Sequence, residues 1–204
     1  MPVKGRREEY AEATKAAIVD AAIERFGADG FARTTIDAIA ETARVTKGGV
    51  YHHFSDKAAL FEAAFVDLEE RLLDAVQAAS TGAGDGWIAI ERGIDAYLDA
   101  CREPSFRRIV LEDAPAALGW TRWKEIDERY FLGTVTAALV ALAATGDITV
   151  TDGELTARML LATMGEAGLA VAAADDPDGV QAEVRRLLVR IVRGLGPGTP
   201  PVGG

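Results

Sequence analysis

The chain of 204 residues contains one cysteine, Cys101, so it cannot form an intrachain disulfide, and a metal site built on thiolates is excluded. Its two histidines are neighbours at positions 52 and 53, and adjacent side chains diverge on a helix. The longest apolar run, 135–144, is too short to cross a bilayer, and no signal peptide opens the chain. We therefore predict a soluble, cytoplasmic protein without metal, cofactor or membrane partner.

The chain also lacks an excess of basic residues, because its formal net charge is -10. This acidity is unevenly distributed. Residues 1–57 hold 9 Lys/Arg and 9 Asp/Glu, whereas residues 58–204 hold 13 and 23. A neutral N-terminal part can still dock on phosphate groups, while the acidic remainder limits unspecific binding to a polyanion.

Strand signals are scarce too, and helical spacing of apolar residues dominates the sequence. The weakly alternating segment 147–151 is short and isolated, so we predict a loop there. We predict an all-α protein of about nine helices. The predicted helical segments are 10–26 (ended by Gly27 and Gly30), 35–43, 47–54, 57–79, 87–103, 105–115, 120–142 (closed by Gly146), 152–174 and 178–195.

Predicted helix starts follow the usual capping residues. Thr34 is placed to cap the N–H of Asp37, Thr46 to cap the next helix, and Ser55 and Asp152 to begin two longer ones. Residues 1–8 precede the first helix as a mobile arm carrying Lys4, Arg6 and Arg7. Such an arm is either a plain disordered terminus or a contact to phosphates or a minor groove.

The most informative stretch is Thr46 to Phe54, TKGGVYHHF. The adjacent glycines Gly48 and Gly49 cost a helix about 2 kcal/mol relative to alanine. Close approach of the backbone to DNA is the best reason for that cost. Val50 is predicted to point inward together with Phe54.

Several side chains near these glycines suit DNA. Lys47 can reach a phosphate or a guanine edge, and Tyr51 and His52 can donate hydrogen bonds. Lys57 adds positive charge near the N-terminus of the following helix. The helix–turn–helix spacing between Thr34 and Lys57 predicts a DNA-binding unit whose second helix enters the major groove.

The stretch GFARTTIDAIAETARVTKGGVYHHFSDKAALF, with the helix before it, resembles the DNA-binding domain of the TetR family of bacterial repressors. The resemblance covers residues 10–65. It implies an all-α homodimer whose first three helices bind DNA and whose other helices form a ligand pocket and the dimer interface.

By position, the resemblance assigns Thr35 to a phosphate contact, Lys57 to phosphate anchoring, and the recognition-helix contacts to Thr46, Lys47, Gly48, Gly49, Tyr51 and His52. Arg44 departs from the pattern, because it replaces the usual turn glycine. If the backbone needs positive φ there, Arg44 costs about 1 kcal/mol, which a phosphate contact could offset.

The implied organisation is a DNA-binding domain at 1–56, a ligand-binding and dimerisation domain at 57–196, and a tail at 197–204 that is disordered by composition. In the second domain, large or soft side chains lie on or beside apolar helix faces. They serve either as core or as the lining of an apolar ligand pocket. The candidate ligand-binding residues are Trp87, Tyr97, Cys101, Phe106, Trp120, Trp123, Tyr130, Met159 and Glu166, with Met164 beside them.

Polar candidates for this pocket are Glu112, Asp113, Arg129 and Glu166. Glu166 falls in the apolar stripe Leu155, Met159, Ala162, Glu166, Leu169 and Ala173. A carboxylate buried there needs an arginine, a ligand or the other subunit as a partner. The sequence leaves these three alternatives open, and we predict a hydrophobic ligand of aromatic or cationic type.

The last two helices are predicted to form the dimer interface. Small residues allow close helix approach in the first of them, at Ala162, Gly165, Gly168, Ala172 and Ala173. The second has an apolar face bordered by arginines, formed by Val180, Val184, Leu187, Leu188, Ile191 and Leu195. Two helices per subunit would make a four-helix bundle, and a twofold dimer suits a palindromic operator.

The sequence thus predicts a homodimeric, ligand-responsive transcriptional repressor that is not an enzyme. Alternatives within regulation are an activator and a ligand-independent repressor. An enzyme that uses the C-terminal pocket is the alternative from another class. It lacks a serine or cysteine beside a base, and no glycine-rich phosphate loop follows a strand.

Overall fold

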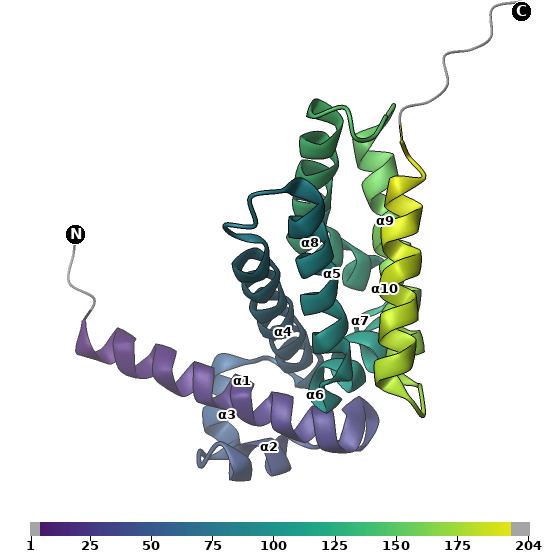
Figure 1. Ribbon diagram of the computed structural model, residues 1–204. Coiled ribbons are helices and arrows are strands. Elements are labelled where there is room, and N and C mark those ends of the chain that lie inside the picture. Colours follow the sequence, from purple (N-terminus) through teal and green to yellow (C-terminus); the bar gives the residue numbers. More distant parts are fainter. Residues whose placement is uncertain (1–4, 197–204) are drawn as a thin grey trace, which may run out of the picture. The chain divides into compact units, whose positions relative to one another are not determined.

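The computed structural model describes residues 5–196, and all regular elements in that range are helical (Figure 1), which confirms the predicted all-α fold. The elements are α1 (Arg6–Arg33), α2 (Ile36–Thr42), α3 (Lys47–His53), α4 (Lys57–Ser80), α5 (Gly86–Arg102), α6 (Pro104–Phe106), the π-helical η1 (Arg107–Asp113), α7 (Ala114–Leu118), α8 (Trp120–Ala144), α9 (Gly153–Ala172) and α10 (Pro177–Arg193). The predicted tail, 197–204, lies outside the described residues.

Capping explains where several helices begin. Thr46 caps α3 and Asp152 caps α9, as predicted. Two predicted caps are wrong by one residue. The residue that caps α2 is Thr35, not Thr34, because the Thr35 hydroxyl accepts a hydrogen bond from the Ala38 N–H. The residue that caps α4 is Asp56, not Ser55, because the Asp56 carboxylate accepts from the Ala59 N–H. Thr34 is buried, and its hydroxyl donates to backbone carbonyls of α1.

The first helix extends further than predicted at both ends. It begins at Arg6, so the predicted arm at 1–8 is wrong from that residue on, and Lys4 lies outside the described residues. Gly27 does not end the helix. A Cβ atom at Gly27 would come within 2.9 Å of the Ser105 Cβ atom, so this glycine is explained by close packing. The break occurs at Gly30, where φ is 79°.

Contacts divide the chain into two units. Unit 1 contains the described residues up to Leu68 together with Pro104–Trp123, and unit 2 contains Glu69–Glu103 and the described residues from Lys124 on. Helix α4 therefore begins in unit 1 and ends in unit 2. The segment 104–123 belongs to unit 1, although residues 69–103 of unit 2 separate it in the chain from the rest of unit 1.

Unit 1 has an aromatic core. The ring of Phe61 lies 5.1 Å from that of Phe26 and 5.0 Å from that of Phe31, in edge-to-face geometry. Val50 and Phe54 are buried as predicted. These side chains fix α3 and α4 against α1 and so determine which face of α3 remains outside.

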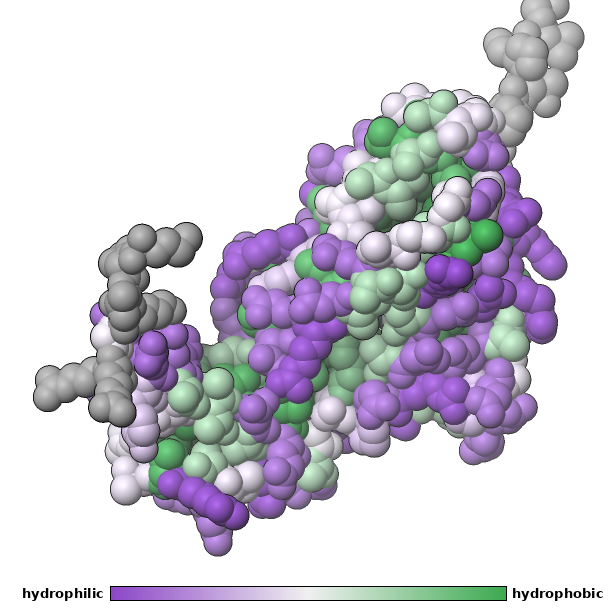
Figure 2. All heavy atoms as spheres, turned by 60° about the vertical axis from the view of Figure 1, so that its left-hand side comes forward, coloured by the Kyte–Doolittle hydropathy of each residue, from purple (hydrophilic) through white to green (hydrophobic). Residues whose placement is uncertain are grey.

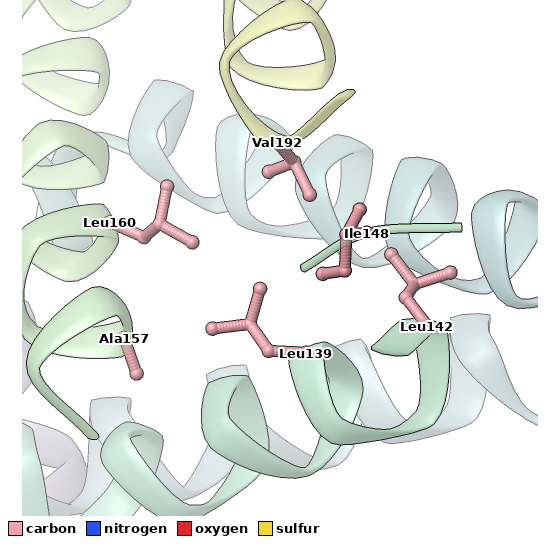
Figure 3. Close-up of a cluster of buried hydrophobic side chains, with 6 residues drawn as sticks. All are labelled: Leu139, Leu142, Ile148, Ala157, Leu160 and Val192. Atoms are coloured by element: carbon pink, nitrogen blue, oxygen red, sulfur yellow. The ribbon is translucent and has the colours of Figure 1, made fainter. Parts of the chain in front are cut away.

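Unit 2 is built mainly from α5, α8, α9 and α10, with two clusters of buried residues. Figure 3 shows the first cluster, in which side chains from α8, α9, α10 and the 147–151 loop converge: Leu139, Leu142, Ile148, Ala157, Leu160 and Val192. The second cluster joins α5, α9 and α10 through Ile94, Leu98, Val171 and Leu188.

Hydrophilic residues cover much of the face drawn in Figure 2, and apolar residues reach the surface in patches between them. Some of the most exposed large apolar side chains belong to α9. Met159 is 66% exposed and Leu155 is 56% exposed. Isolated exposed apolar residues need no explanation, but several on one helix mark a candidate contact surface.

Candidate nucleic-acid interface

The short helix α2 is anchored from inside and capped from outside. Ile36 and Ile39 are buried in unit 1, and the Thr35 hydroxyl accepts a hydrogen bond from the Ala38 N–H at 3.2 Å. Thr35 itself is exposed. The residue predicted to contact a phosphate thus lies on the surface at a helix N-terminus, where backbone N–H groups favour anions.

The turn between α2 and α3 has left-handed backbone at one residue. Arg44 has φ of 56°, the only positive φ among the described non-glycine residues. This confirms the condition under which an arginine at this position is strained. The Val45 N–H donates to the Ala40 carbonyl at 3.0 Å and closes the turn. The Arg44 side chain is exposed.

Helix α3 begins at a threonine cap, because the Thr46 hydroxyl accepts from the Gly49 N–H at 3.0 Å. Neither of its glycines has positive φ. A Cβ atom at Gly48 would meet only the Thr46 hydroxyl, at 3.9 Å, and one at Gly49 would make ordinary contacts of 3.4 Å and longer. Packing within the described part of the protein therefore does not require glycine at either position. A molecule that approaches the outer surface of α3 closely would require it.

The outer face of α3 carries groups that can meet DNA. Tyr51 is 48% exposed, and Lys47 and His52 are exposed as well. The Lys47 ammonium forms an exposed ion pair with Asp37 at 2.8 Å. A hydrogen bond from Lys47 to this carboxylate, together with its charge, raises the pKa of Lys47. Asp37 thus orients the Lys47 side chain on the surface of α3.

Lys57 is hydrogen-bonded inside unit 1. Its ammonium donates to the backbone carbonyls of Phe31 at 2.8 Å, Thr34 at 3.2 Å and Ala32 at 3.5 Å, and lies 4.4 Å from the centre of the Phe31 ring. An ammonium has three N–H donors, and all three have a partner here. In the free protein Lys57 therefore secures the C-terminal end of α1.

The same end of α1 is held by η1. The Asp113 carboxylate accepts from the Phe31 N–H at 2.7 Å and lies 3.3 Å from the Arg108 guanidinium. That guanidinium fills the space beside Gly30, where a Cβ atom would come within 2.5 Å of an Arg108 nitrogen. Glu112 and Asp113 were predicted as pocket residues. Both form ion pairs with Arg108 inside unit 1.

The predicted pocket residues are divided between the two units. Phe106, Trp120 and Trp123 lie in unit 1, whereas the other six belong to unit 2. Trp120 is 65% exposed and packs only partly against Trp123, at 4.8 Å between ring centres. Trp87 packs against the cluster of Figure 3, with the Arg193 guanidinium 4.7 Å from its ring centre.

The stripe predicted to face inward on α9 faces outward instead. Met159 is 66% exposed, and Glu166 is exposed within the subunit, so no arginine of its own subunit buries it. The helix is apolar on all sides, so periodicity could not show which face is inside. The buried face carries Gly168, where a Cβ atom would come within 2.6 Å of the Tyr97 hydroxyl. The prediction that Gly168 serves the dimer interface is therefore wrong.

A feature that sequence reasoning missed lies inside unit 2. Glu69 is only 2% exposed, and burial raises its pKa well above the usual range. Burial also raises the pKa of Asp127 to about 6 and that of the nearby Cys101 thiol to about 12. Glu69 follows Phe65 by four residues and precedes Leu72 by three. Its place in the apolar stripe of α4 was the signal that could have revealed it.

No group of three or more potential metal ligands occurs among the described residues. What the geometry does define is a helix–turn–helix unit with an exposed, glycine-bearing second helix. Proteins of this class read DNA in the major groove.

Comparisons with known proteins give the family. A family model for bacterial regulatory proteins of the tetR family matches residues 18–64, and one for the tetracyclin repressor-like C-terminal domain matches residues 87–195, more than half of the chain. The chain belongs to the TetR family and is a DNA-binding transcriptional regulator.

Individual relatives agree with this assignment. The chain is 28% identical to the transposon Tn10 TetC protein of Escherichia coli over 160 residues, which are 78% of this chain and 81% of that protein. It is 46% identical over 65 residues to the regulator TtgR of Pseudomonas putida, about a third of each chain. The crystal structure of a TetR-family regulator from Pectobacterium atrosepticum superposes with a TM-score of 0.79 at 29% identity, covering 94% of this chain and 97% of that one.

Proposed function

We propose that this regulator is a homodimeric repressor that binds a palindromic operator through α3 and is released by a small hydrophobic effector. Within this proposal, residues 1–56 bind DNA, and residues 57–196 bind the effector and form the dimer. The contacts to DNA come from Thr35, Arg44, Thr46, Lys47, Gly48, Gly49, Tyr51 and His52.

The observation that carries the proposal is the unexplained pair of glycines at the start of α3. Gly48 and Gly49 weaken the helix, and no neighbour within the described residues needs the space they leave. A DNA backbone or base edge against this surface supplies the missing reason. Exposed Lys47 and Tyr51 flank the glycines and match phosphate and base edges in chemistry.

Lys57 takes an indirect part in this proposal. Its ammonium is committed to carbonyls of α1, so it supports DNA binding by fixing α1 against α4. The phosphate contact that the family resemblance assigned to it would require these bonds to break.

Support for the dimer comes from the outward faces of the last two helices. On α9, Leu155, Met159 and Leu169 are exposed, and on α10, Leu187 and Ile191 are 44% and 45% exposed. Apolar residues on both faces of a helix are expected where one face packs on its own subunit and the other face packs on a second subunit. A twofold dimer would present two α3 helices one DNA turn apart.

Effector control is proposed to pass along α4. This helix runs without interruption from Lys57, beside the DNA-binding elements, to Ser80 in unit 2. A ligand that binds more tightly to one arrangement of α4 shifts the population toward it and changes the spacing of the recognition helices. Repression then ends because the dimer no longer matches its operator.

Selection from random duplex DNA tests the operator proposal. The wild-type protein should enrich an inverted repeat with half-site centres about 10 base pairs apart or a multiple of this. Lys47→Ala and Tyr51→Ala should weaken binding to the selected DNA by roughly 1–3 kcal/mol each. Enrichment of no sequence by the wild-type protein would contradict the proposal.

A reporter gene placed behind the selected DNA distinguishes the modes of regulation. Lower expression with the protein than without it is expected for a repressor, and higher expression would identify an activator. Derepression by added hydrophobic compounds would separate a ligand-responsive repressor from a ligand-independent one. Turnover of such a compound by the purified protein would instead favour an enzyme.

A further inference from the structure

The last helix, α10, carries a concentration of positive charge that its surroundings do not share. Residues 185–193 hold four arginines and no acidic residue, whereas the rest of residues 58–204 holds 9 Lys/Arg and 23 Asp/Glu. The four arginines line a surface groove of about 340 Å³ together with Val189 of α10 and Glu91 of α5. We call it the arginine groove. A cationic groove on an acidic body attracts anions locally.

On the α5 side of the arginine groove, the positive charge is already matched. The Glu91 carboxylate accepts a hydrogen bond from the Arg185 guanidinium at 2.9 Å and lies 3.5 Å from the Arg193 guanidinium. Arg185 also pairs with Asp95 at 2.8 Å. The forked guanidinium group suits carboxylates. This side of the groove therefore already binds the kind of group that we expect an external ligand to supply on the other side.

The outer side of the arginine groove has unmatched charge. Arg190 is exposed and forms no ion pair with the described residues. Arg186 pairs with Glu183 of the same helix, but both side chains are more than half exposed, so water weakens the pair. Like charges four residues apart destabilise a helix. The helix dipole favours cations only in the last turn, so it accounts for Arg190 and Arg193 but not for Arg186.

The arginine groove and the proposed dimer surface lie on different sides of α10. Successive residues of a helix are rotated by about 100°, so Leu187 and Ile191 each lie about 160° around the helix from Val189. Leu187 and Ile191 are the exposed apolar residues of the proposed dimer surface, and Val189 lines the groove. A ligand in the groove and a second subunit would therefore not compete for the same face.

The spacing of the outer arginines favours an elongated ligand. Arg186, Arg190 and Arg193 follow one another by four and three residues, so they form a row about 10 Å long. An extended peptide advances about 7 Å with every second residue, so acidic side chains on one of its faces can reach two or three of these arginines. Duplex DNA or a membrane surface is much wider than this row and would also meet Glu183 and the exposed Asp178.

We propose that the arginine groove is a docking site for a short, extended, acidic segment of a partner protein, whose carboxylates bind Arg186, Arg190 and Arg193. Val189 offers an apolar contact for the stems of the acidic side chains. Docking there requires neither operator DNA nor the proposed hydrophobic effector. The alternative is a cationic surface that binds no partner.

Fluorescence anisotropy with purified full-length protein and a fluorescein-labelled hexaglutamate peptide tests this proposal. Binding should saturate, and it should weaken between about 50 mM and about 200 mM salt, because exposed charge pairs are screened. A peptide of the same length with alternating glutamate and lysine should bind at least about fivefold more weakly. Unlabelled hexaglutamate should displace the labelled peptide at a lower concentration than pyrophosphate, whose charges lie too close together to follow the row.

Matched double variants assign the site. Arg186→Gln/Arg190→Gln should reduce the affinity for hexaglutamate about fivefold or more. Arg44→Gln/Arg129→Gln is the control, because it removes the same charge from two exposed arginines outside the groove and should leave the affinity unchanged. Circular dichroism confirms that each variant is folded.

Three results would overturn the proposal: no binding of hexaglutamate by the wild type, equal affinity in both double variants, or displacement at a lower concentration by pyrophosphate. A fourth would assign the arginines to nucleic acid instead. In that case Arg186→Gln/Arg190→Gln would lose affinity for duplex DNA of random sequence and keep its affinity for the peptide.

Discussion

At the residue scale, Arg44 is the position where backbone strain is most evident. Its φ of 56° costs an L-residue with a side chain about 1 kcal/mol relative to glycine. We expect Arg44→Gly to raise the free energy of unfolding by roughly 0.5 kcal/mol, since glycine also makes the unfolded chain more flexible. Urea denaturation of the two proteins measures this difference.

Arg44→Ala is the control for this prediction. It removes the same charge but keeps the Cβ atom, so it should leave the stability close to that of the wild type. A gain equal to that of Arg44→Gly would show that charge, not backbone strain, limits the stability of the turn. A loss of DNA affinity in both variants would in turn support the proposed phosphate contact of Arg44.

Asp127 makes stability depend on pH. Burial raises its pKa to about 6 in the folded protein, above the unfolded value of about 3.9. The folded state therefore binds more protons between these values, and this contribution to stability is lost as the pH rises from about 4 through 6. Asp127→Asn should therefore be more stable than the wild type at pH 7, by a larger margin than at pH 4. Thermal unfolding at both values measures the difference.

The control for the pH effect is Asp74→Asn, which removes an exposed carboxyl from α4. Its stability relative to the wild type should be the same at pH 4 and pH 7. If Asp127→Asn behaved in the same way as this control, Asp127 would have an ordinary pKa in the folded protein.

At the element scale, the helices could be predicted because local signals define them. Caps such as Thr46 and Asp152 and three- to four-residue apolar spacing act within one or two turns, so the sequence contains them directly. The exposed face of α3 followed from the same pattern, since Val50 and Phe54 marked its inner side.

Long-range packing could not be predicted in this way. Gly27 is required by Ser105, nearly eighty residues away, and the apolar helix α9 gives no periodic sign of which face is inside. The pocket residues were grouped by residue type, but their neighbours depend on how α5, α8 and α9 pack. Glu69 was overlooked because one carboxyl in an apolar stripe is weak evidence until its burial is known.

Lys57 connects the first turn of α4 to the last turn of α1. Lys57→Met would leave the carbonyls of Phe31 and Thr34 without the ammonium that now donates to them. We expect the free energy of unfolding to fall by about 1–3 kcal/mol, measured by urea denaturation. Lys47→Met, which breaks only an exposed ion pair, should lower the free energy of unfolding clearly less than Lys57→Met does. Equal losses would show that Lys57 has no special structural role.

At the scale of the whole molecule, the distribution of charge separates two tasks. The first 57 residues are neutral overall and contain the proposed DNA-binding helix α3, whereas the net charge of -10 arises entirely from the remainder. Phosphate attraction is therefore local to the reading surface. This favours a selective reader over a protein that coats DNA.

The proposed dimer depends on the outward face of α9. Met159→Glu places a charge among Leu155 and other exposed apolar side chains and should shift the protein to monomers in sedimentation experiments. Val140→Glu is the matched control, since Val140 is also exposed, at 59%, but lies on α8. Dimers that persist in Met159→Glu would place the interface elsewhere.

The most direct test of the account is Gly48→Ala, examined for stability and for operator binding together. No neighbour within the described residues obstructs a Cβ atom at Gly48, so alanine should stabilise α3 by about 0.5–1 kcal/mol. The same methyl group should hinder close approach to DNA, so fluorescence anisotropy with the selected operator should show weaker binding, by about tenfold. A more stable protein with reduced operator affinity is the predicted result. Unchanged operator affinity would contradict the claim that α3 is the surface that reads DNA.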